Sequence, residues 1–513
     1  MRKIIFLINL SIVYLSLSIA DDESRYAAID RHALNAPASV TKSIKTLSSY
    51  LTKPFSTDEE KARAIFRWIA NNISYDVKGY FSGDYSSTQS GDVLESRSSV
   101  CAGYSSLFEA LGKEAGLEVA SIDGYAKGFA YEPGDKIPSE TNHAWNAIKI
   151  NGEWKLVDCT WGAGSVDYDH SFKKEFEPYY FFTKPEEFIY RHLPTDEHWQ
   201  LLKKPVSQRE FQNLPFVSPN FFECELVIQN KEQAVLDVQE GNVVEIYAPT
   251  NVYCMASLEQ KGRVFENAAL IQRTGLIYRV RVRPPTSGEY FLNIFAKRGR
   301  SDGSYPHAIK FKVITHSNEA KSESFPVTFA AFLERNVQLQ SPITKELPSG
   351  SIQIFSLTVA NADRVAVVCG EEWDFLKKHG EQFEGMVEID VGRITVFAQY
   401  PDRQEYQALL EYQGTGSNKR APSPIKYERY MNSGAEIVGP LRKELIAGSP
   451  QFFRIKLPGA TKAAIIMGQE WNHLKQQGEY FEGTVEIKKG KVILFATYQN
   501  STSYEGILEY EGK

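Results

Sequence analysis

The chain has 513 residues, of which 42% are hydrophobic and 24% are charged, a composition typical of a folded globular protein. Its net charge is −6 and it contains no long basic run, which argues against nucleic acid as a partner. At roughly 100–200 residues per domain, this length predicts about three to five domains.

The N-terminus has the pattern of a secretory leader. Two basic residues after Met1 precede a nearly continuous apolar run, 4–17, and a small-residue cleavage pattern ends at Ala20. We therefore expect a signal peptide, 1–20, and a secreted protein with no membrane span after signal cleavage. The run is shorter than the roughly 20 residues of a spanning helix, and an uncleaved signal anchor is the alternative.

Two segments are expected before residue 100. Thr57 and Glu60 fit a capping box at the start of a helix whose apolar residues recur at helical spacing. The following stretch, 77–97, is rich in Gly, Ser and Asp and carries Tyr80 and Phe81. It is too long for a plain connector, and it is either a loop bordering a cleft or a disordered insertion.

Cys101 is expected in the first turn of a helix that ends at Gly116. Its apolar face would be formed by Tyr104, Leu107, Phe108 and Leu111. The serines before Cys101 are candidate N-caps. Unpaired backbone N–H groups and the positive end of the helix dipole favour a thiolate in the first turn, and the same groups would stabilise an oxyanion.

His143 begins a strand-like run that is joined to a second run by Asn151-Gly152. Asn-Gly between two such runs predicts a type I′ hairpin, in which Ile150 faces Glu153. Continued to the strand ends, this register puts His143, Trp145 and Asp158 on one face of the sheet. His143 and Asp158 become diagonal neighbours, about 7–8 Å apart between backbones.

The chain order Cys101, His143, Asp158 is that of a nucleophile, its base and the residue that orients the base. Taken singly, each has a structural alternative: a small buried residue, a structural histidine and a turn cap. The hairpin register favours the three acting as a set. Trp145 and Tyr104 are candidates for lining the active site, with core packing as the alternative.

Three motifs carry a family resemblance: Ser99-Val-Cys101-Ala-Gly-Tyr104, Asn142-His143-Ala-Trp145-Asn146 and Trp154-Lys-Leu-Val-Asp158-Cys159-Thr-Trp161-Gly. They resemble the transglutaminase-like cysteine protease superfamily and, within it, are most like the kyphoscoliosis peptidase (KY) group. The resemblance covers roughly residues 40 to 200. It implies an α+β, papain-like core in which the nucleophile, base and orienting acid are Cys101, His143 and Asp158. Cys159 stands where many bacterial relatives have proline, which fits the KY type.

The five cysteines and the few clustered carboxylates bear on disulfide formation and metal binding. An odd count leaves at least one free thiol, and Cys224 and Cys254 could form a disulfide in a secreted protein. Asp167 and Asp169 alone do not make a calcium site. We expect no cofactor and no metal.

The second half of the chain predicts tandem all-β, immunoglobulin-like sandwiches. Short strand patterns separated by turn residues follow a composition change near 203–220. A gapless repeat with an offset of 98 pairs Trp373 with Trp471, and a more diverged copy precedes it. We expect both tryptophans to be core anchors rather than a ligand surface. The predicted domains are 21–204 (transglutaminase-like), 205–316, 320–414 and 418–513.

Three functions fit these features. The first is a cysteine peptidase or amidase that acts on protein substrates through an acyl-thioester. The second is a protein-crosslinking transglutaminase. The third, which the resemblance also supports, is a catalytically silent binding or scaffold protein linked to the cytoskeleton or matrix.

Overall fold

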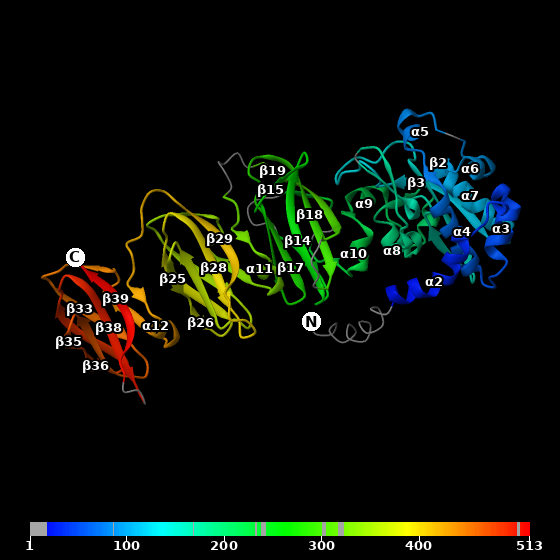
Figure 1. Ribbon diagram of the computed structural model, residues 1–513. Helices are drawn as coiled ribbons and strands as arrows, with labels where there is room; N and C mark the ends of the chain where they lie inside the picture. The colour runs from blue at the N-terminus through cyan, green and yellow to red at the C-terminus, as the bar shows by residue number, and fades with distance from the viewer. Residues whose placement is uncertain are drawn as a thin grey trace, which may run out of the picture. The chain divides into compact units, whose positions relative to one another are not determined.

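The computed structural model describes residues 18–513 except 86, 168, 231–232, 238–242, 300–303, 317–322 and 500–502. The chain forms two compact units, Met1–Ser322 and Glu323–Lys513 (Figure 1). Most of the predicted leader, 1–20, lies outside the described residues. Helix α2 (Ser18–Leu34) continues through the expected cleavage position at Ala20. Within the described part of the chain, no helix has the length and apolarity needed to cross a membrane.

The first unit begins with helices. After α2 come α3 (Ile44–Thr52), α4 (Asp58–Asn72), α5 (Val77–Ser82), α6 (Ser90–Ser96) and α7 (Cys101–Glu114). The capping box at the start of α4 is confirmed, because the Thr57 side chain accepts from the Glu60 N–H and the Glu60 carboxylate accepts from the Thr57 N–H.

Helix α7 begins where the sequence predicts but is capped differently. Cys101 is its first residue, and the chain leaves the helix through Gly116, which has a positive φ of 80°. The predicted serine cap is wrong: the N-cap is Val100, and no side chain caps the helix. The reason is that Ser98–Ser99 form strand β2, which pairs with β1 (Ser74–Tyr75).

A five-stranded antiparallel sheet lies behind α7. Its order is β8-β5-β4-β3-β9, with bounds β3 (Val119–Ala126), β4 (His143–Ile150), β5 (Glu153–Val157), β8 (Phe181–Thr183) and β9 (His192–Pro194). The predicted hairpin register is confirmed, since Ile150 pairs with Glu153 and Asn146 with Val157. Asn151 and Gly152 both have positive φ, as a type I′ turn requires.

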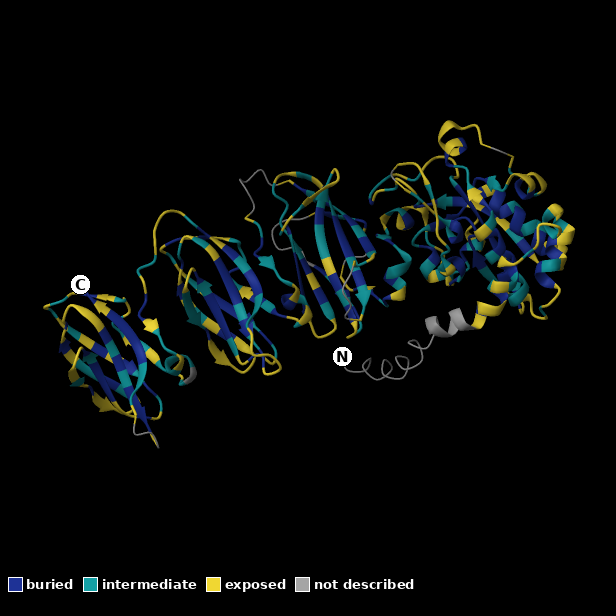
Figure 2. Ribbon diagram, viewed as in Figure 1, coloured by how far each residue is buried: buried dark blue, intermediate teal, exposed yellow. Residues whose placement is uncertain are grey.

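The core of this region lies between the sheet and helices α4 and α7 (Figure 2). The predicted apolar face of α7 is confirmed, and the four side chains that form it are fully buried: Tyr104, Leu107, Phe108 and Leu111. Burying side chains of this size stabilises the fold by about 1.5–3 kcal/mol each. The first residue of α7 is thereby fixed against the start of β4. Short elements complete the region: β6 (Gly164–Val166), β7 (Phe172–Lys174), α8 (Pro185–Phe188) and α9 (Gln208–Asn213).

A β-sandwich follows within the first unit. One sheet has the order β10-β19-β18-β14-β15, with β12 parallel to β19, and the other has the order β11-β13-β17-β16. The bounds are β10 (Phe216–Val217), α10 (Pro219–Glu223), β11 (Val227–Ile228), β12 (Val235–Asp237), β13 (Val243–Tyr247), β14 (Val252–Gln260), β15 (Arg263–Phe265), β16 (Ala269–Thr274), β17 (Ile277–Val282), β18 (Gly288–Arg298) and β19 (His307–Thr315).

The second unit contains two more sandwiches of the same strand order. The first consists of β20 (Val327–Thr328), α11 (Ala330–Glu334), β21 (Gln338–Ser341), β22 (Glu346–Pro348), β23 (Ile352–Thr358), β24 (Arg364–Cys369), β25 (Glu372–Phe375), β26 (Lys377–His379), β27 (Gln382–Glu388), β28 (Gly392–Gln399) and β29 (Gln407–Thr415). The second consists of β30 (Ile425–Lys426), α12 (Glu428–Asn432), β31 (Glu436–Gly439), β32 (Glu444–Leu445), β33 (Pro450–Lys456), β34 (Ala460–Met467), β35 (Glu470–His473), β36 (Lys475–Gln477), β37 (Tyr480–Glu486), β38 (Gly490–Tyr498) and β39 (Glu505–Gly512).

Equivalent elements of these two sandwiches begin 98 residues apart at β20 and β30, at α11 and α12, and at β27 and β37. The repeat in the sequence is therefore a repeat of structure. The matching strand order of the first unit's sandwich supports its reading as a diverged third copy. The domain boundaries themselves remain predictions.

The prediction that Trp373 and Trp471 are core anchors is wrong. Trp471 is 46% exposed, and Trp373 is half-buried. Trp373 lies on strand β25 opposite Val368, whose neighbours Val367 and Cys369 are buried. Alternation along the strand therefore turns both Val368 and Trp373 toward the outer face. Each tryptophan instead packs edge-on against a surface tyrosine, Tyr406 in one repeat and Tyr504 in the other.

The suggested disulfide is also wrong. Cys224 and Cys254 are both buried free thiols. The Cys224 thiol donates a hydrogen bond to the Asn220 side-chain oxygen, at 3.3 Å.

Candidate functional site

Cys101 is the first residue of α7, and its thiol is close enough to His143 for that ring to influence the thiol's pKa. The residue is only 8% exposed. Burial by itself would raise the pKa of the thiol. The hydrogen bond to His143 and the charge of that ring, together with the backbone N–H of Ala144, more than offset this and lower the pKa. The pKa of the Cys101 thiol is therefore lowered, as predicted. The lowering contributions come from His143 and Ala144 of strand β4.

All five cysteines lie in the described part of the chain, and Cys101 alone has a lowered pKa. Burial raises the pKa of Cys224 and Cys369 to about 11 and that of Cys254 to about 12. The pKa of Cys159, fully buried beside Asp158, also lies well above its usual value. Cys101 is therefore the thiol that ionises most readily in the folded protein.

His143 lies between Cys101 and Asp158. Its Nε2 is 2.8 Å from Asp158 Oδ2, and Nε2 is thus engaged by the carboxylate. The remaining ring nitrogen, Nδ1, is the one left for the thiol. Burial would lower the pKa of His143, but the charge and hydrogen bond of Asp158, with the contribution of Cys101, raise it to about 10. At neutral pH the arrangement favours a thiolate–imidazolium pair.

Asp158 is completely buried, and both of its carboxylate oxygens accept hydrogen bonds. Burial would raise its pKa, but His143 and a second histidine, His192, hold it well below the usual range. Its Oδ1 accepts from the backbone N–H groups of Thr160 and Trp161, at 2.8 and 3.0 Å. The structure thus brings all three predicted residues together.

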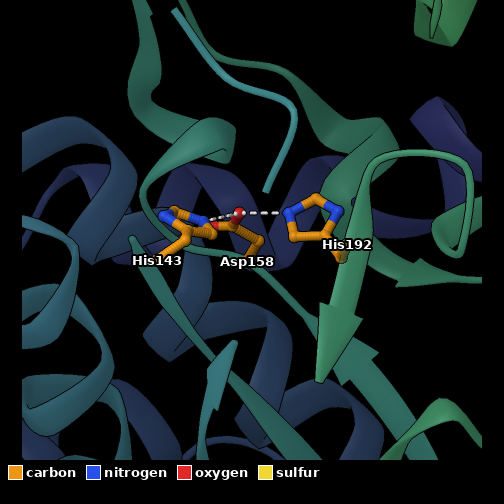
Figure 3. Close-up of side chains that lie close together, drawn as sticks. All are labelled: His143, Asp158 and His192. Atoms are coloured by element: carbon orange, nitrogen blue, oxygen red, sulfur yellow. Dashed lines mark hydrogen bonds and ion pairs between the residues drawn. The ribbon is translucent and has the colours of Figure 1, made fainter. Parts of the chain in front are cut away.

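His192 is the functional candidate that the sequence analysis missed. Its Nε2 is 3.0 Å from Asp158 Oδ2, the same oxygen that His143 contacts, and the two rings approach Asp158 from opposite sides (Figure 3). Burial lowers the pKa of His192 to about 4. His192 begins a short apolar segment that forms strand β9 (His192–Pro194), but the sequence does not show which strand this segment pairs with.

The ligand-type atoms of His143, Asp158 and His192 lie within 4.8 Å of one another, a grouping that could hold a metal ion. The hydrogen bonds favour a different role. Both histidines already contact one Asp158 oxygen, and two backbone N–H groups occupy the other. A metal would have to replace the protons on both rings.

The two predicted lining residues occupy different positions. Tyr104 is fully buried, and its hydroxyl donates to the Ile73 carbonyl at 2.8 Å, as a core residue would. Trp145 is 1% exposed, with its ring 6.0 Å from the His143 ring and 5.2 Å from the His192 ring. Trp161, which the sequence analysis did not propose, lies nearer to both, at 5.2 and 4.3 Å.

A cleft of about 1020 Å³ leads to His143. One wall belongs to the papain-like core and the other to the first sandwich, through Phe216, Phe295 and Lys310. Tyr80 and Phe81 also line it, so this part of 77–97 borders a cleft as predicted, but as helix α5 rather than as the expected loop. At its edge the Phe81 ring stacks on His170 at 4.1 Å and meets Phe129 at 5.7 Å.

Comparisons with known proteins agree with the resemblance. Residues 45–159 match the family model of the transglutaminase-like superfamily, and residues 208–346 match that of the KY-like, immunoglobulin-like domain. Kyphoscoliosis peptidase of Mus musculus is 29% identical over 93% of this chain and 76% of its own length. Hillarin of Drosophila melanogaster is 32% identical over 54% of this chain and 37% of its own length. These matches confirm the predicted fold class, an α+β core followed by immunoglobulin-like sandwiches.

The same comparisons correct the prediction of secretion. A further relative, 24% identical over 50% of this chain and 28% of its own length, is named cytokinesis protein 3, from Schizosaccharomyces pombe. Cytokinesis takes place inside the cell, so this relative contradicts an extracellular assignment. This relative therefore contradicts both the prediction of a secreted protein and its alternative, a signal-anchored protein.

Proposed function

Because this chain is a KY-like, transglutaminase-like protein, we propose that it is a cysteine peptidase or amidase acting on protein substrates. Cys101 is the nucleophile, His143 the general base and acid, and Asp158 the residue that orients His143. The observation that carries this proposal is the hydrogen bond between His143 and Asp158, with the Cys101 thiol close enough to the His143 ring for that ring to lower its pKa. It is supported by the lowered pKa of Cys101, the only lowered thiol pKa of the five.

The reaction follows from these positions. The Cys101 thiolate attacks an amide carbonyl, and a carbon–sulfur bond forms as the carbonyl becomes tetrahedral. His143 then donates its proton to the leaving nitrogen, the carbon–nitrogen bond breaks, and an acyl-thioester remains. His143, now neutral, accepts a proton from water as the water attacks the thioester. The carbon–sulfur bond then breaks, which releases the carboxylic acid product and returns the Cys101 thiolate beside the protonated His143. Throughout these steps Asp158 keeps the ring in the orientation that serves Cys101.

A second candidate is a protein that binds partners through its sandwiches. The presence of three sandwiches of one strand order favours it, since tandem domains of this kind offer repeated surfaces. The two functions are compatible, with the sandwiches selecting the protein on which the core acts.

The test is incubation of the purified full chain with a mixture of cytosolic and cytoskeletal proteins, followed by mass spectrometry. New protein termini would report peptide hydrolysis, glutamine-to-glutamate conversion would report side-chain amide hydrolysis, and isopeptide bonds would report crosslinking. We expect hydrolysis by the wild type and none by Cys101→Ala.

The matched control is Cys369→Ala, which removes another buried free thiol, from strand β24 of the second unit. It should retain full activity. Isopeptide bonds alone would replace the proposal with crosslinking. Identical products from the wild type and Cys101→Ala would leave the binding function as the remaining candidate.

A further inference from the structure

We infer that His192 is a positioning residue that holds Asp158 in the orientation in which it serves His143. The inference rests on the proposed function, because it assigns a role within the same site. His192 lies outside the 45–159 match to the transglutaminase-like family model. It is contributed by β9, a strand that joins the sheet next to β3.

The sheet register brings His192 to the correct face. His143 on β4 is opposite Gly124 on β3, which in turn is opposite Pro194 on β9. Opposite residues share a face, and so do residues two apart on a strand. His192, two residues before Pro194, therefore projects on the same face as His143, with one strand between them. Asp158 at the end of β5 lies between the two rings (Figure 3).

His192 restricts the one movement that the backbone leaves to Asp158. Two backbone N–H groups hold Oδ1, and His143 contacts Oδ2. With those contacts alone, only His143 would hold Oδ2 against rotation of the carboxylate. His143 is also the residue that Asp158 has to orient. The second contact at Oδ2, from His192 at 3.0 Å, fixes this oxygen independently of His143.

His192 donates this hydrogen bond as a neutral ring. A carboxylate can only accept, so the proton must be on His192 Nε2. The other nitrogen, Nδ1, is buried and has no hydrogen-bond partner among the described residues. The charged groups that face the ring are Asp158, His143 and Arg191, and the two cationic ones disfavour a second proton. A neutral donor orients Asp158 without competing with His143 for its negative charge.

The ring of His192 is held by packing rather than by a bond at Nδ1. It stacks on Phe188 with a centroid distance of 3.8 Å and an interplanar angle of 13°. Trp161 and Trp145 close its other sides, at 4.3 and 5.2 Å. A histidine with only a structural role would have these same contacts. The test must therefore distinguish the packing of the His192 ring from its hydrogen bond to Asp158.

Two variants make that separation. His192→Phe keeps a ring that can stack on Phe188 but has no donor, whereas His192→Gln keeps an N–H donor. Both are prepared in the full chain, and thermal unfolding first establishes that they fold. The rate of Cys101 alkylation by iodoacetamide is then measured from pH 5 to 10. In parallel, ¹⁵N-histidine NMR spectra report the tautomer of His192 and the pKa of His143.

We expect His192→Phe to raise the apparent pKa of Cys101 by about one unit, the size that corresponds to losing a hydrogen bond to a charged group. The pKa of His143 should fall, and His192→Gln should restore part of both changes. A wild-type pH profile for His192→Phe would overturn the inference. Equal shifts in both variants would also overturn it, because the donor would then not be the cause.

The NMR measurement distinguishes failure of this inference from failure of the proposed function. If wild-type Cys101 titrates as an ordinary thiol, the proposed nucleophile is lost. The His143 pKa then decides the role of His192. A lower His143 pKa in His192→Phe than in the wild type would still support positioning, and an unchanged value would exclude it.

Discussion

At the scale of single residues, burial opposes the charged forms of Cys101, His143 and Asp158. For each of the three, loss of water is the largest influence on the pKa, and it favours the neutral group. Their mutual contacts reverse that preference in every case. The charge on each group therefore depends on the presence of the next, and removal of any one should change the ionisation of the others.

The first prediction concerns Cys101 and His143. Wild-type Cys101 should react with iodoacetamide with an apparent pKa below the value of about 8.5 for a free thiol. In His143→Ala the pKa should rise above 8.5, because the burial that raises it remains while the lowering contributions of the His143 ring are lost. Labelling is followed by mass spectrometry of the Cys101 peptide across pH 5–10.

The other four cysteines are the internal controls for this measurement. Their pKa values are all raised, so they should remain unlabelled in the folded protein at neutral pH. The activated-nucleophile assignment would be wrong if the Cys101 pKa were unaffected by His143→Ala.

The second prediction concerns the free energy of unfolding of Asp158→Asn. This variant is compared with its parent, and both carry Cys101→Ala so that the thiol does not titrate. In the wild type, burial alone would lower the pKa of His143, but Asp158 and to a smaller extent Cys101 outweigh burial and raise the folded pKa to about 10, above its unfolded value of 6.5. The part due to Asp158 remains in the Cys101→Ala background, so the stability from the ion pair is full below pH 6.5 and is lost as the pH rises through the folded pKa. The Asp158 pKa is depressed, so its share is present above pH 3.8 and is lost in acid.

Asp158→Asn should therefore reduce the free energy of unfolding most between about pH 4 and 6.5, by about 3 kcal/mol, the usual cost of breaking a buried ion pair. The deficit should shrink as the pH rises from 6.5 toward 10, the range in which the contribution of protonated His143 to stability is lost. Urea unfolding at pH 6 and pH 9.5 measures both values. A deficit that grows with pH would contradict the assignment of charge to His143.

How much of this site the sequence could predict depends on local signals. The Asn151-Gly152 turn fixes the register of one hairpin as far as Asn146 and Val157, and Asp158 follows Val157 directly, where it reaches His143. His192 has no such signal, because β9 has three residues and joins the sheet through a non-consecutive pairing with β3. Its position is determined by the tertiary fold alone.

At the scale of elements, the pairing of β3 with β9 determines whether His192 reaches Asp158. Gly124 lies at the centre of this pairing. A Cβ at that position would be 2.3 Å from the Leu193 carbonyl oxygen, 2.5 Å from the Trp145 ring and 2.9 Å from Pro194 Cα. Two of these contacts are with backbone atoms that cannot move without shifting β9. The absence of a side chain at residue 124 therefore allows the close approach.

The third prediction is that Gly124→Ala destabilises the protein by about 1–3 kcal/mol or more, the range for overpacking a core. Displacement of β9 should also weaken the contact between His192 and Asp158, and the apparent pKa of Cys101 should rise. Thermal unfolding and iodoacetamide labelling measure the two effects. The matched control is Gly91→Ala in α6, where a Cβ would meet nothing within 4 Å. If both variants behaved like the wild type, β3 and β9 would not need this close approach.

The elements also show which patterns can be read from sequence. The helical face of α7 is predictable because its apolar residues recur at helical spacing and are all buried. The N-cap of the same helix is not, since Ser98 and Ser99 pair with β1 from a segment more than twenty residues earlier. Capping preferences describe isolated helices, and strand pairing overrides them here.

At the scale of the whole molecule, repetition in the sequence predicts repetition in structure but not which side chains face inward. The two repeats of the second unit share strand order and spacing. Their matching tryptophans nevertheless lie on the outer face, with Trp471 46% exposed. A residue preserved by duplication can serve a surface as well as a core, and the pattern of β25 is too short to distinguish them.

The two repeats of the second unit are joined by a polar contact at β25. Arg420, in the linker, donates to both oxygens of Asp374, and its side chain is 10% exposed. Lys426, on the first strand of the second repeat, donates to the Trp373 carbonyl at 3.0 Å. The linker is thereby bound to the first repeat before the second begins.

The fourth prediction is that Arg420→Ala loosens the linker between the repeats. Loss of hydrogen bonds to a charged, mostly buried partner should cost about 2 kcal/mol. Trypsin should then cleave after Lys419, the site in 414–424 that this variant keeps, faster than in the wild type, as followed by mass spectrometry of the fragments. The control, Lys488→Ala, removes a pair with Glu470 whose members are 57% and 58% exposed and should have little effect. Equal cleavage rates in Arg420→Ala and the wild type would mean that the strands on either side, rather than this ion pair, hold the linker in place.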